Sequence, residues 1–310
     1  MDLRTRYLGL SLAHPFMPGA SPLDGDLDTV LRLEDAGASA LVMHSLFEED
    51  IERAAPTTGE YLERLLRIKR RVAIPVVASL NGTTAAGWLK YAGLIERAGA
   101  DALELNFYHV AADVHEDAAR VEHRVLDIVA VLKESVRIPL AVKLSPFYSA
   151  LPHLAAQLDR IGADGLVLFN RFYQPDIDPD RREPSMQLQY SDSSELPLRL
   201  RWIAILSGRV NASLALTGGV HEPMDAVKAV LAGAHAVQIV SALMKGGPRR
   251  LTAIRDGFAC WADDHGYASV DAMRGAASLS QCADPEGFER GNYQELLQAA
   301  RHRRLAWSGH

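Results

Sequence analysis

Hydrophobic and polar positions along the chain repeat one short motif four times. A Gly-Ala pair is followed after one further residue by a mostly apolar run, at 37–42, 99–104, 162–167 and 233–238. Each copy comes after an amphipathic stretch. Glycine suits the left-handed position that closes a helix, and a short apolar run suits a strand buried on both faces. We therefore interpret the four copies as joints between a helix and a strand, and call them the helix–strand joints.

A second set of apolar runs lies between these joints. Neighbouring joints are separated by about twice the length of one strand–helix unit, so one more strand is expected in each interval. Runs at 71–78, 136–143 and 209–216 fill the intervals, and residues 16–20 precede the first helix. Eight strands alternating with helices predict an α/β fold, a closed (β/α)₈ barrel, because parallel strands need crossover helices and cover on both faces.

The length of the chain fits one barrel domain. We expect residues 1–310 to form that domain, with a short N-terminal β-hairpin at 3–10 and a helical tail at 266–310. The formal net charge is −6 and the sequence pI is near 6.0. Since no basic stripe is present, nucleic acid is not expected as a partner.

No stretch predicts secretion or insertion into a membrane. Residues 1–4 carry no apolar signal core, and the uncharged stretch 229–244 is too short to span a bilayer. Cys260 and Cys282 have neither metal nor redox spacing. We therefore expect a cytoplasmic protein whose two thiols are reduced and structural.

In a (β/α)₈ barrel, reactive groups lie on the loops that follow the carboxyl ends of the strands. That rule selects eight windows: 19–21, 43–45, 78–82, 104–109, 142–146, 169–171, 216–219 and 239–242. The last two windows contain Gly218, Gly219 and Ser241. Barrels commonly bind phosphate with backbone N–H groups from these two loops, so we favour a phosphate site over a plain tight turn.

Lys143 ends an otherwise apolar strand and should place an ammonium in the barrel mouth. Burying a charge is costly without a partner. One interpretation is an internal ion pair with Glu104 on the neighbouring strand. The functional interpretations are a cation beside a flavin ring, which we rank first, and a Schiff-base nucleophile.

Two asparagines flank this lysine in the predicted barrel. Asn106 and Asn170 end the fourth and sixth strands and present amide donors and acceptors. A single asparagine is commonly a strand-end cap, whereas the pair around Lys143 favours recognition of a planar, amide-rich ring.

These windows together resemble the dihydroorotate dehydrogenase family of FMN-dependent barrels, over roughly residues 3–257. The matching motifs are Phe16-Met17 with Gly19-Ala20-Ser21, then 104–106, 142–146, Asn170, 217–220 and 237–243. The resemblance implies that FMN is surrounded by Ala20, Ser21, Ser45, Asn106, Lys143, Gly218, Gly219, Val240 and Ser241. It also implies that Asn106 and Asn170 contact the substrate.

The departures from the family concentrate around the expected substrate. His109 stands where the family has a Cys or Ser base, and the asparagine that should follow is missing. His44 replaces the family's lysine at the end of strand two, and Arg171 replaces a small hydroxyl residue. The family's asparagine-bearing substrate loop has no counterpart in 48–70. We therefore expect a retained cofactor site and a changed substrate site to which His44 and Arg171 contribute.

His109 is our hypothesis for the catalytic base. Oxidation of dihydroorotate removes a proton from one carbon while hydride leaves the next, and histidine titrates near neutrality. The alternative is that Phe107, Tyr108 and His109 only cover the flavin face. A metal at His44 and His109 is a weaker interpretation, because no further ligand follows at metal spacing, and we predict no metal.

The segment 171–195 is a long loop of mixed charge after strand six. Loops of this length in a compact barrel are usually lids or spacers. Arg171 at its start could bind a substrate carboxylate as a fork, or it could be a solvated surface arginine. The tail could pack on the barrel or contribute to a homo-oligomer.

The leading prediction is an FMN-dependent oxidoreductase that oxidises dihydroorotate or a related dihydropyrimidine by hydride transfer to flavin N5, in pyrimidine biosynthesis. One alternative is a flavin-free aldolase or lyase that uses Lys143. The other is a flavoprotein that relays electrons without dihydroorotate activity. Since the chain has no cysteine cluster for an iron–sulfur centre, a separate electron-transfer protein is a candidate partner.

Overall fold

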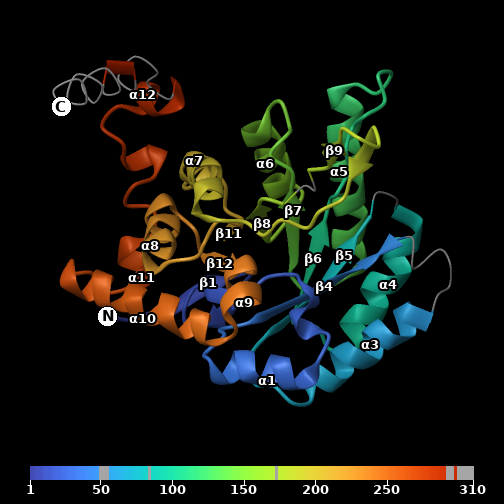
Figure 1. The fold of residues 1–310 in the computed structure, drawn as a ribbon, viewed down its shortest axis with the longest axis horizontal. Helices are drawn as coiled ribbons and strands as arrows, with labels where there is room; N and C mark the ends of the chain where they lie inside the picture. The colour runs from blue at the N-terminus through green and yellow to red at the C-terminus, as the bar shows by residue number, and fades with distance from the viewer. Residues whose placement is uncertain (49–55, 83–84, 172–173, 291–296, 299–310) are drawn as a thin grey trace.

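Eight parallel strands form one sheet that curls into a nearly closed (β/α)₈ barrel, with helices around its outside (Figure 1). The computed structural model describes residues 1–48, 56–82, 85–171, 174–290 and 297–298. In sheet order the strands are β3 (Phe16–Pro18), β12 (Ala236–Ile239), β11 (Ser213–Thr217), β8 (Gly165–Leu168), β7 (Leu140–Leu144), β6 (Ala102–Asn106), β5 (Val76–Asn81) and β4 (Leu41–Phe47). The expected fold class is confirmed.

The seam of the barrel lies between β3 and β4, the two ends of the sheet order. Ser39 bridges it, because its backbone N–H and its hydroxyl both donate to the carbonyl oxygen of Phe16, at 3.2 and 2.7 Å. A single polar residue before β4 thus links β4 to β3, the two strands at the ends of the sheet order.

Helices connect and cover the strands. The longer ones are α1 (Leu27–Asp35), α3 (Pro56–Lys69), α4 (Ala85–Arg97), α5 (Ala118–Ser135), α6 (Leu151–Arg160), α7 (Leu196–Leu206), α8 (Pro223–Ala232) and α10 (Arg249–Asp264). Shorter ones are η1 (Pro22–Asp24), η2 (Ser193–Glu195), α9 (Ser241–Gly246), α11 (Val270–Met273), η3 (Leu279–Gln281) and α12 (Pro285–Arg290). Their apolar faces pack on the outer faces of the strands in one large cluster.

The helix–strand joints are confirmed. Gly37, Gly99, Gly162 and Gly233 have φ of 92°, 88°, 94° and 123°, the region where a side chain is strained. The other strands begin later than their apolar runs, at Val76, Leu140 and Ser213. In two of them a proline immediately precedes the strand, and the carbonyl oxygens of Pro75 and Pro139 accept from Leu41 and Leu103 at 2.9 Å. Proline can accept at a strand start although it cannot donate.

Inside the barrel, alternate residues of each strand point inward. Near the amino end this layer consists of Met17, Val42, Val77, Ala102, Ala141, Val167, Ala215 and Ala236. Four of these are alanines, which leave room on the barrel axis. The antiparallel hairpin β1 (Thr5–Tyr7) and β2 (Leu10–Leu12) fills it with Tyr7, Leu8 and Leu12, all 1–2% exposed. The hairpin therefore plugs the amino end, and the next inward positions are polar.

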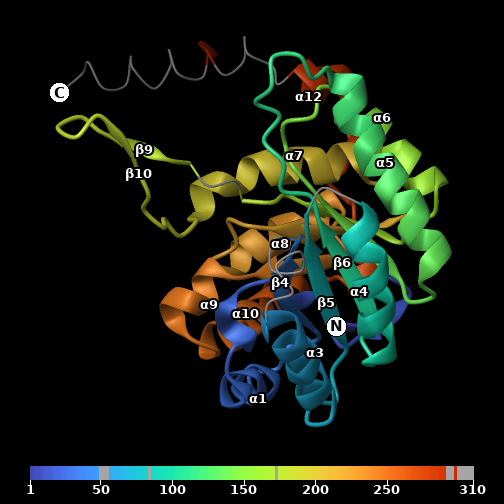
Figure 2. The same cartoon turned by 90° about the vertical axis from the view of Figure 1, so that its right-hand side faces the viewer.

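The long loop after β8 carries secondary structure of its own. Strands β9 (Asp176–Asp178) and β10 (Glu183–Ser185) pair as a second hairpin that projects away from the barrel (Figure 2). Its apolar side chains are exposed, including Ile177 at 72% and Met186 at 83%. A lid function for this loop stays a prediction.

The described part of the C-terminal region contains three short helices, α11, η3 and α12, joined by non-helical segments. Cys260 and Cys282 are free thiols. None of the described helices is both long enough and apolar enough to cross a membrane. Much of the expected tail, 291–296 and 299–310, lies outside the described residues.

Candidate active site

A cavity of about 610 Å³ lies at the carboxyl ends of the strands, a size typical of small-molecule sites. Twelve of the residues singled out in the sequence line it: Ala20, Ser21, His44, Ser45, Asn106, Lys143, Asn170, Arg171, Gly218, Gly219, Val240 and Ser241. They come from seven different strand ends and their loops. Barrel closure therefore gathers residues more than 200 positions apart into one site.

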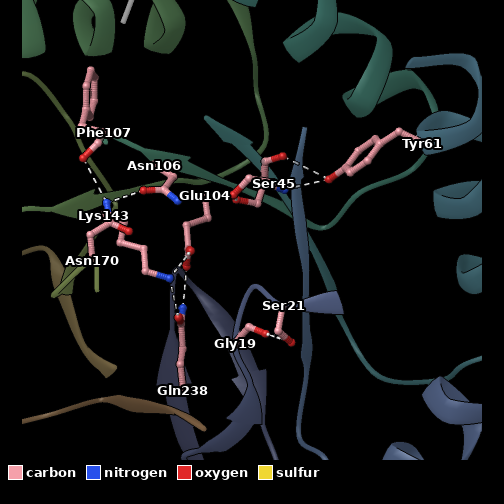
Figure 3. Close-up of polar contacts among 11 residues, drawn as sticks. Gly19, Ser21, Ser45, Tyr61, Glu104, Asn106, Phe107, Lys143, Asn170 and Gln238 are labelled. Carbon is pink, nitrogen blue, oxygen red and sulfur yellow. Dashed lines mark hydrogen bonds and ion pairs between the residues drawn. The ribbon is translucent and has the colours of Figure 1, made fainter. Parts of the chain in front are cut away.

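Lys143 forms a buried polar cluster on the floor of this cavity. Its Nζ lies 3.1 Å from Oε1 of Glu104 and 3.3 Å from Oε1 of Gln238 (Figure 3). The amide Nε2 of Gln238 donates to the other carboxylate oxygen of Glu104. All three residues are 6% exposed or less. The ion pair between Lys143 and Glu104, which the sequence analysis ranked behind the flavin role, is present, and Gln238 donates to the remaining carboxylate oxygen.

This cluster follows from strand periodicity. Ala102, Glu104 and Asn106 alternate along β6, so all three face the barrel axis at successive heights. The same alternation places Lys143 one step above Ala141. The apolar plug therefore lies below, the ion pair in the middle, and the amides at the mouth.

Asn106 and Asn170 interact directly at the mouth. The side-chain NH₂ of Asn170 donates to the side-chain oxygen of Asn106 and, at 3.0 Å, to the carbonyl oxygen of Phe107. The NH₂ of Asn106 points towards Oγ of Ser45 at 3.4 Å, and that hydroxyl lies 2.8 Å from Oγ of Ser79. The two amides are held in a defined orientation, which suits recognition of a planar ring.

Gly218 and Gly219 form a turn with φ of 91° and 80°. A Cβ on Gly219 would lie 2.7 Å from the backbone nitrogen of Leu196, so no other residue fits there without movement. The buried guanidinium of Arg199 lies beneath this turn, donating from Nε to the carbonyl oxygen of Thr217 at 2.9 Å. The turn thus presents bare backbone to the cavity above a positive charge.

Ser241 and Arg171 complete the same side of the site. Oγ of Ser241 accepts from the backbone N–H of Ser191 at 3.1 Å, which leaves its hydroxyl proton available to a ligand. Nε of Arg171 donates to Oε1 of Glu195 at 3.2 Å, and Arg199 contacts the other oxygen of that carboxylate. Glu195 therefore connects the arginine at the cavity to the arginine under the turn.

On the opposite side of the mouth, His44 is held by a buried carboxylate. Oδ2 of Asp24 lies 2.8 Å from Nδ1 of His44, and Oδ1 accepts from the backbone N–H of His44 at 3.2 Å. Nη1 of Arg64 lies 3.4 Å from both ring nitrogens. Tyr61 packs edge-on against the imidazole, with the ring centroids 5.2 Å apart.

His109 lies apart from the residues lining this cavity. Its Nε2 is 3.2 Å from Oε2 of Glu116 and 3.1 Å from Nη1 of Arg124. The hydrogen bond from His109, together with Arg124, lowers the pKa of the Glu116 carboxyl. Its neighbour Tyr108 lines the cavity instead.

Six cavity-related residues were missed by the sequence analysis. Five of them line the cavity, namely Pro22, Gly25, Phe47, Arg64 and Ser191, and Asp24 supports His44 from behind. Arg64 lies in the middle of helix α3 and Ser191 near the end of a long loop, so neither falls in a strand-end window. Asp24 has only the weak signal of an acidic residue soon after a strand.

These residues fit FMN on the evidence of the cavity itself. Gly218 and Gly219 line the cavity with backbone alone, Ser241 lines it as well, and no Asp or Glu is among the described lining residues. Lys143 offers an ammonium, and the paired asparagines offer amide groups for a heterocycle. Across the described part of the chain, no group of three His, Cys, Asp or Glu side chains is arranged to hold a metal ion.

The structure is a (β/α)₈ barrel whose cavity contains a glycine turn, one buried lysine and paired amides at its mouth. The comparison with known families then gives the family of the chain. The sequence model described as dihydroorotate dehydrogenase matches residues 51–260. The chain belongs to the dihydroorotate dehydrogenase family.

Relatives with assigned names cover most of the chain. It is 29% identical over 302 residues to the dihydroorotate dehydrogenase B (NAD(+)) catalytic subunit of Thermoplasma acidophilum. The aligned region covers 89% of this chain and 99% of that protein. The corresponding subunit of Methanothermobacter thermautotrophicus is 25% identical, with 89% and 98% covered. The NAD-dependent dihydropyrimidine dehydrogenase subunit PreA of Escherichia coli is 23% identical, with 89% and 77% covered.

Proposed function

We propose that this protein is an FMN-dependent oxidoreductase that oxidises the CH–CH bond of dihydroorotate or a related dihydropyrimidine. The observation that carries the proposal is the arrangement of Lys143, Glu104 and Gln238 in the same cavity as the bare Gly218–Gly219 turn. Family membership supports it, since the named relatives are dehydrogenases of such compounds.

The residues divide between cofactor and substrate. The residues that would hold FMN are Ala20, Ser21, Ser45, Asn106, Lys143, Gly218, Gly219, Val240 and Ser241. FMN, when bound, supplies a hydride acceptor. Gly218, Gly219 and Ser241 would bind the phosphate, and Lys143 would neutralise negative charge on the ring. The substrate would contact His44, Asn106, Asn170 and Arg171, with the asparagines orienting it through amide hydrogen bonds.

The base hypothesis for His109 stays a prediction. To reach the cavity, its ring has to leave Glu116 and Arg124. A His109→Ala variant that keeps both the rate of flavin reduction and its pH profile would remove His109 from the mechanism.

The flavin-free aldolase is the second candidate on the same fold. The structure speaks against it on one point, since an ammonium in an ion pair with Glu104 lacks the lone pair that attacks a carbonyl. The electron-relay alternative stays open, and a separate electron-transfer protein is a candidate partner for it and for the leading function. One relative is named a catalytic subunit and another a subunit, which supports such a partner.

A visible spectrum followed by anaerobic titration tests the proposal. The purified protein should be yellow, or become yellow on adding FMN, and dihydroorotate or dihydrouracil should bleach the flavin bands. Flavin that no dihydropyrimidine bleaches favours the electron relay. Colourless protein that takes up no FMN, with borohydride trapping of a carbonyl compound on Lys143, favours the aldolase.

A further inference from the structure

The Asp24–His44 pair has a geometry that substrate binding alone does not require. Asp24 is 1% exposed, and its side chain lies on η1 directly behind His44. Both of its carboxylate oxygens accept from His44, one from the ring and one from the backbone. A buried carboxylate is costly unless its acceptors are satisfied, so this arrangement fixes the position of one imidazole.

The hydrogen bond to Asp24 also selects the tautomer of His44. A carboxylate can only accept, so the proton lies on Nδ1 and the lone pair of the neutral ring lies on Nε2. Arg64 can only donate, and its Nη1 lies 3.4 Å from both ring nitrogens, so a bound molecule has to displace this long contact to reach the lone pair. Since His44 lines the cavity, Nε2 is the ring nitrogen available to a bound molecule.

The packing around the ring keeps it in place. The hydroxyl of Tyr61 donates to the carbonyl oxygen of Ser79 at 3.2 Å and accepts from its backbone N–H at 2.9 Å. Its ring packs edge-on against His44. Among the described residues, the titratable or charged side chains in contact with the imidazole are Asp24 from η1 and Tyr61 and Arg64 from α3.

We propose that His44 is the proton acceptor of the oxidation and that Asp24 is its positioning residue. The inference rests on the proposed function. As the C–H bond of one carbon breaks, its proton passes to Nε2 of His44, which becomes an imidazolium paired with Asp24. The electron pair of that bond forms the new C=C bond while the neighbouring carbon loses hydride to oxidised FMN. His44 thereby takes the role that the sequence hypothesis gave to His109, whose Nε2 faces Glu116 and Arg124 outside the cavity lining.

The decisive variant is His44→Asn. The asparagine NH₂ can replace the Nδ1 donor to Asp24 but has no atom at Nε2, so the pair is kept while the base is removed. In FMN-loaded protein mixed anaerobically with dihydroorotate, flavin reduction should slow by about 10²-fold or more and lose the wild-type dependence on pH. Free imidazole should restore part of the rate to His44→Ala. His123→Asn, at an exposed position on α5, should match the wild type.

A second readout does not depend on activity. Nitrogen-15 NMR of histidine-labelled protein should show His44 protonated on Nδ1 in the neutral form, and Asp24→Asn should shift this signal and slow flavin reduction. The inference is overturned if His44→Asn keeps the wild-type rate and pH profile, if His109→Asn alone removes the pH dependence, or if the proton lies on Nε2. If the wild type itself holds FMN but no dihydropyrimidine bleaches it, the proposed function fails instead.

Discussion

At the residue scale, the site depends on polar side chains that are buried together. Lys143, Glu104 and Gln238 satisfy one another on the barrel axis, and Asp24 and His44 do so at the rim. In each case one charged or titratable group is held by partners from another strand or loop. Removing one partner therefore affects more than the contact that is lost.

Lys143→Met should show this directly. The change leaves the Glu104 carboxylate buried without its cation, which typically costs about 3–5 kcal/mol of unfolding free energy. Urea unfolding of the FMN-free protein measures it. Adding Glu104→Gln removes the stranded charge and should recover a large part of the loss, whereas equal stabilities of the single and double variants would contradict the argument.

The glycine turn permits a matched comparison. Gly219→Ala forces a Cβ to 2.7 Å from the backbone of Leu196, at a φ of 80°. Gly266 has a φ of 73° and open space within 4 Å of the position that a Cβ would take, so Gly266→Ala carries only the backbone strain, about 1 kcal/mol. We expect Gly219→Ala to lose bound FMN on gel filtration while Gly266→Ala keeps it. Equal flavin retention would remove the turn from the cofactor site.

At the scale of elements, the two β-hairpins differ in location and in burial. The β1–β2 hairpin is buried and fills the amino end of the barrel, while the β9–β10 hairpin is exposed and follows the cavity loop after β8. The first is expected to determine stability, because it completes the inner core. The second is expected to contribute little to it.

Leu8→Ala tests the plug. Leu8 is 1% exposed and packs against the inner face at Gly165, so its truncation should cost about 2–4 kcal/mol. Leu188→Ala, in the exposed loop at 78% exposure, should change the free energy of unfolding by less than about 0.5 kcal/mol. Chemical denaturation compares the two, and similar losses would show that the hairpin is not part of the core.

At the scale of the whole molecule, the buried His14 and the partly buried His235 link stability to pH. Burial lowers the pKa of His14 and of His235 to about 4, from an ordinary value of 6.5. Nδ1 of each accepts a backbone N–H, from Phe16 and Leu214 respectively, so both are neutral in the folded protein. They lie beside β3 and β12, on opposite sides of one strand pairing.

The sign of the effect follows from linkage. Below pH 6.5 the unfolded chain takes up protons that the folded chain does not. The contribution of these histidines to the free energy of unfolding is therefore fully present above pH 6.5 and decreases as the pH falls towards 4. Each histidine contributes up to about 3 kcal/mol over the full range. Urea unfolding between pH 7.5 and 5 should show the decline, and His14→Asn with His235→Asn should flatten it. An unchanged slope in the double variant would contradict the assignment.

How much of this was visible in the sequence depends on the range of the interaction. The four helix–strand joints and the alternation of Ala102, Glu104 and Asn106 are local features, set by backbone conformation and a period of two. The joints predict the barrel, and the rule that reactive groups follow the strand ends, together with the family resemblance, selects twelve of the residues that line its cavity. The strand starts were less accurate, because a proline that precedes a strand looks like part of the same apolar run.

Only the tertiary structure decided which side chains hydrogen-bond to one another in and around the site. Nothing in the sequence links Asp24 to His44, brings Arg64 from the middle of a helix to the cavity, or places His109 against Glu116 and Arg124. These contacts depend on the path of loops and the facing of helices, which have no repeating pattern. The sequence by itself determined the scaffold and its ring of polar strand ends, because periodicity is local. The direction and hydrogen bonding of His44 are decided by Asp24 and Arg64, each 20 positions away in the chain.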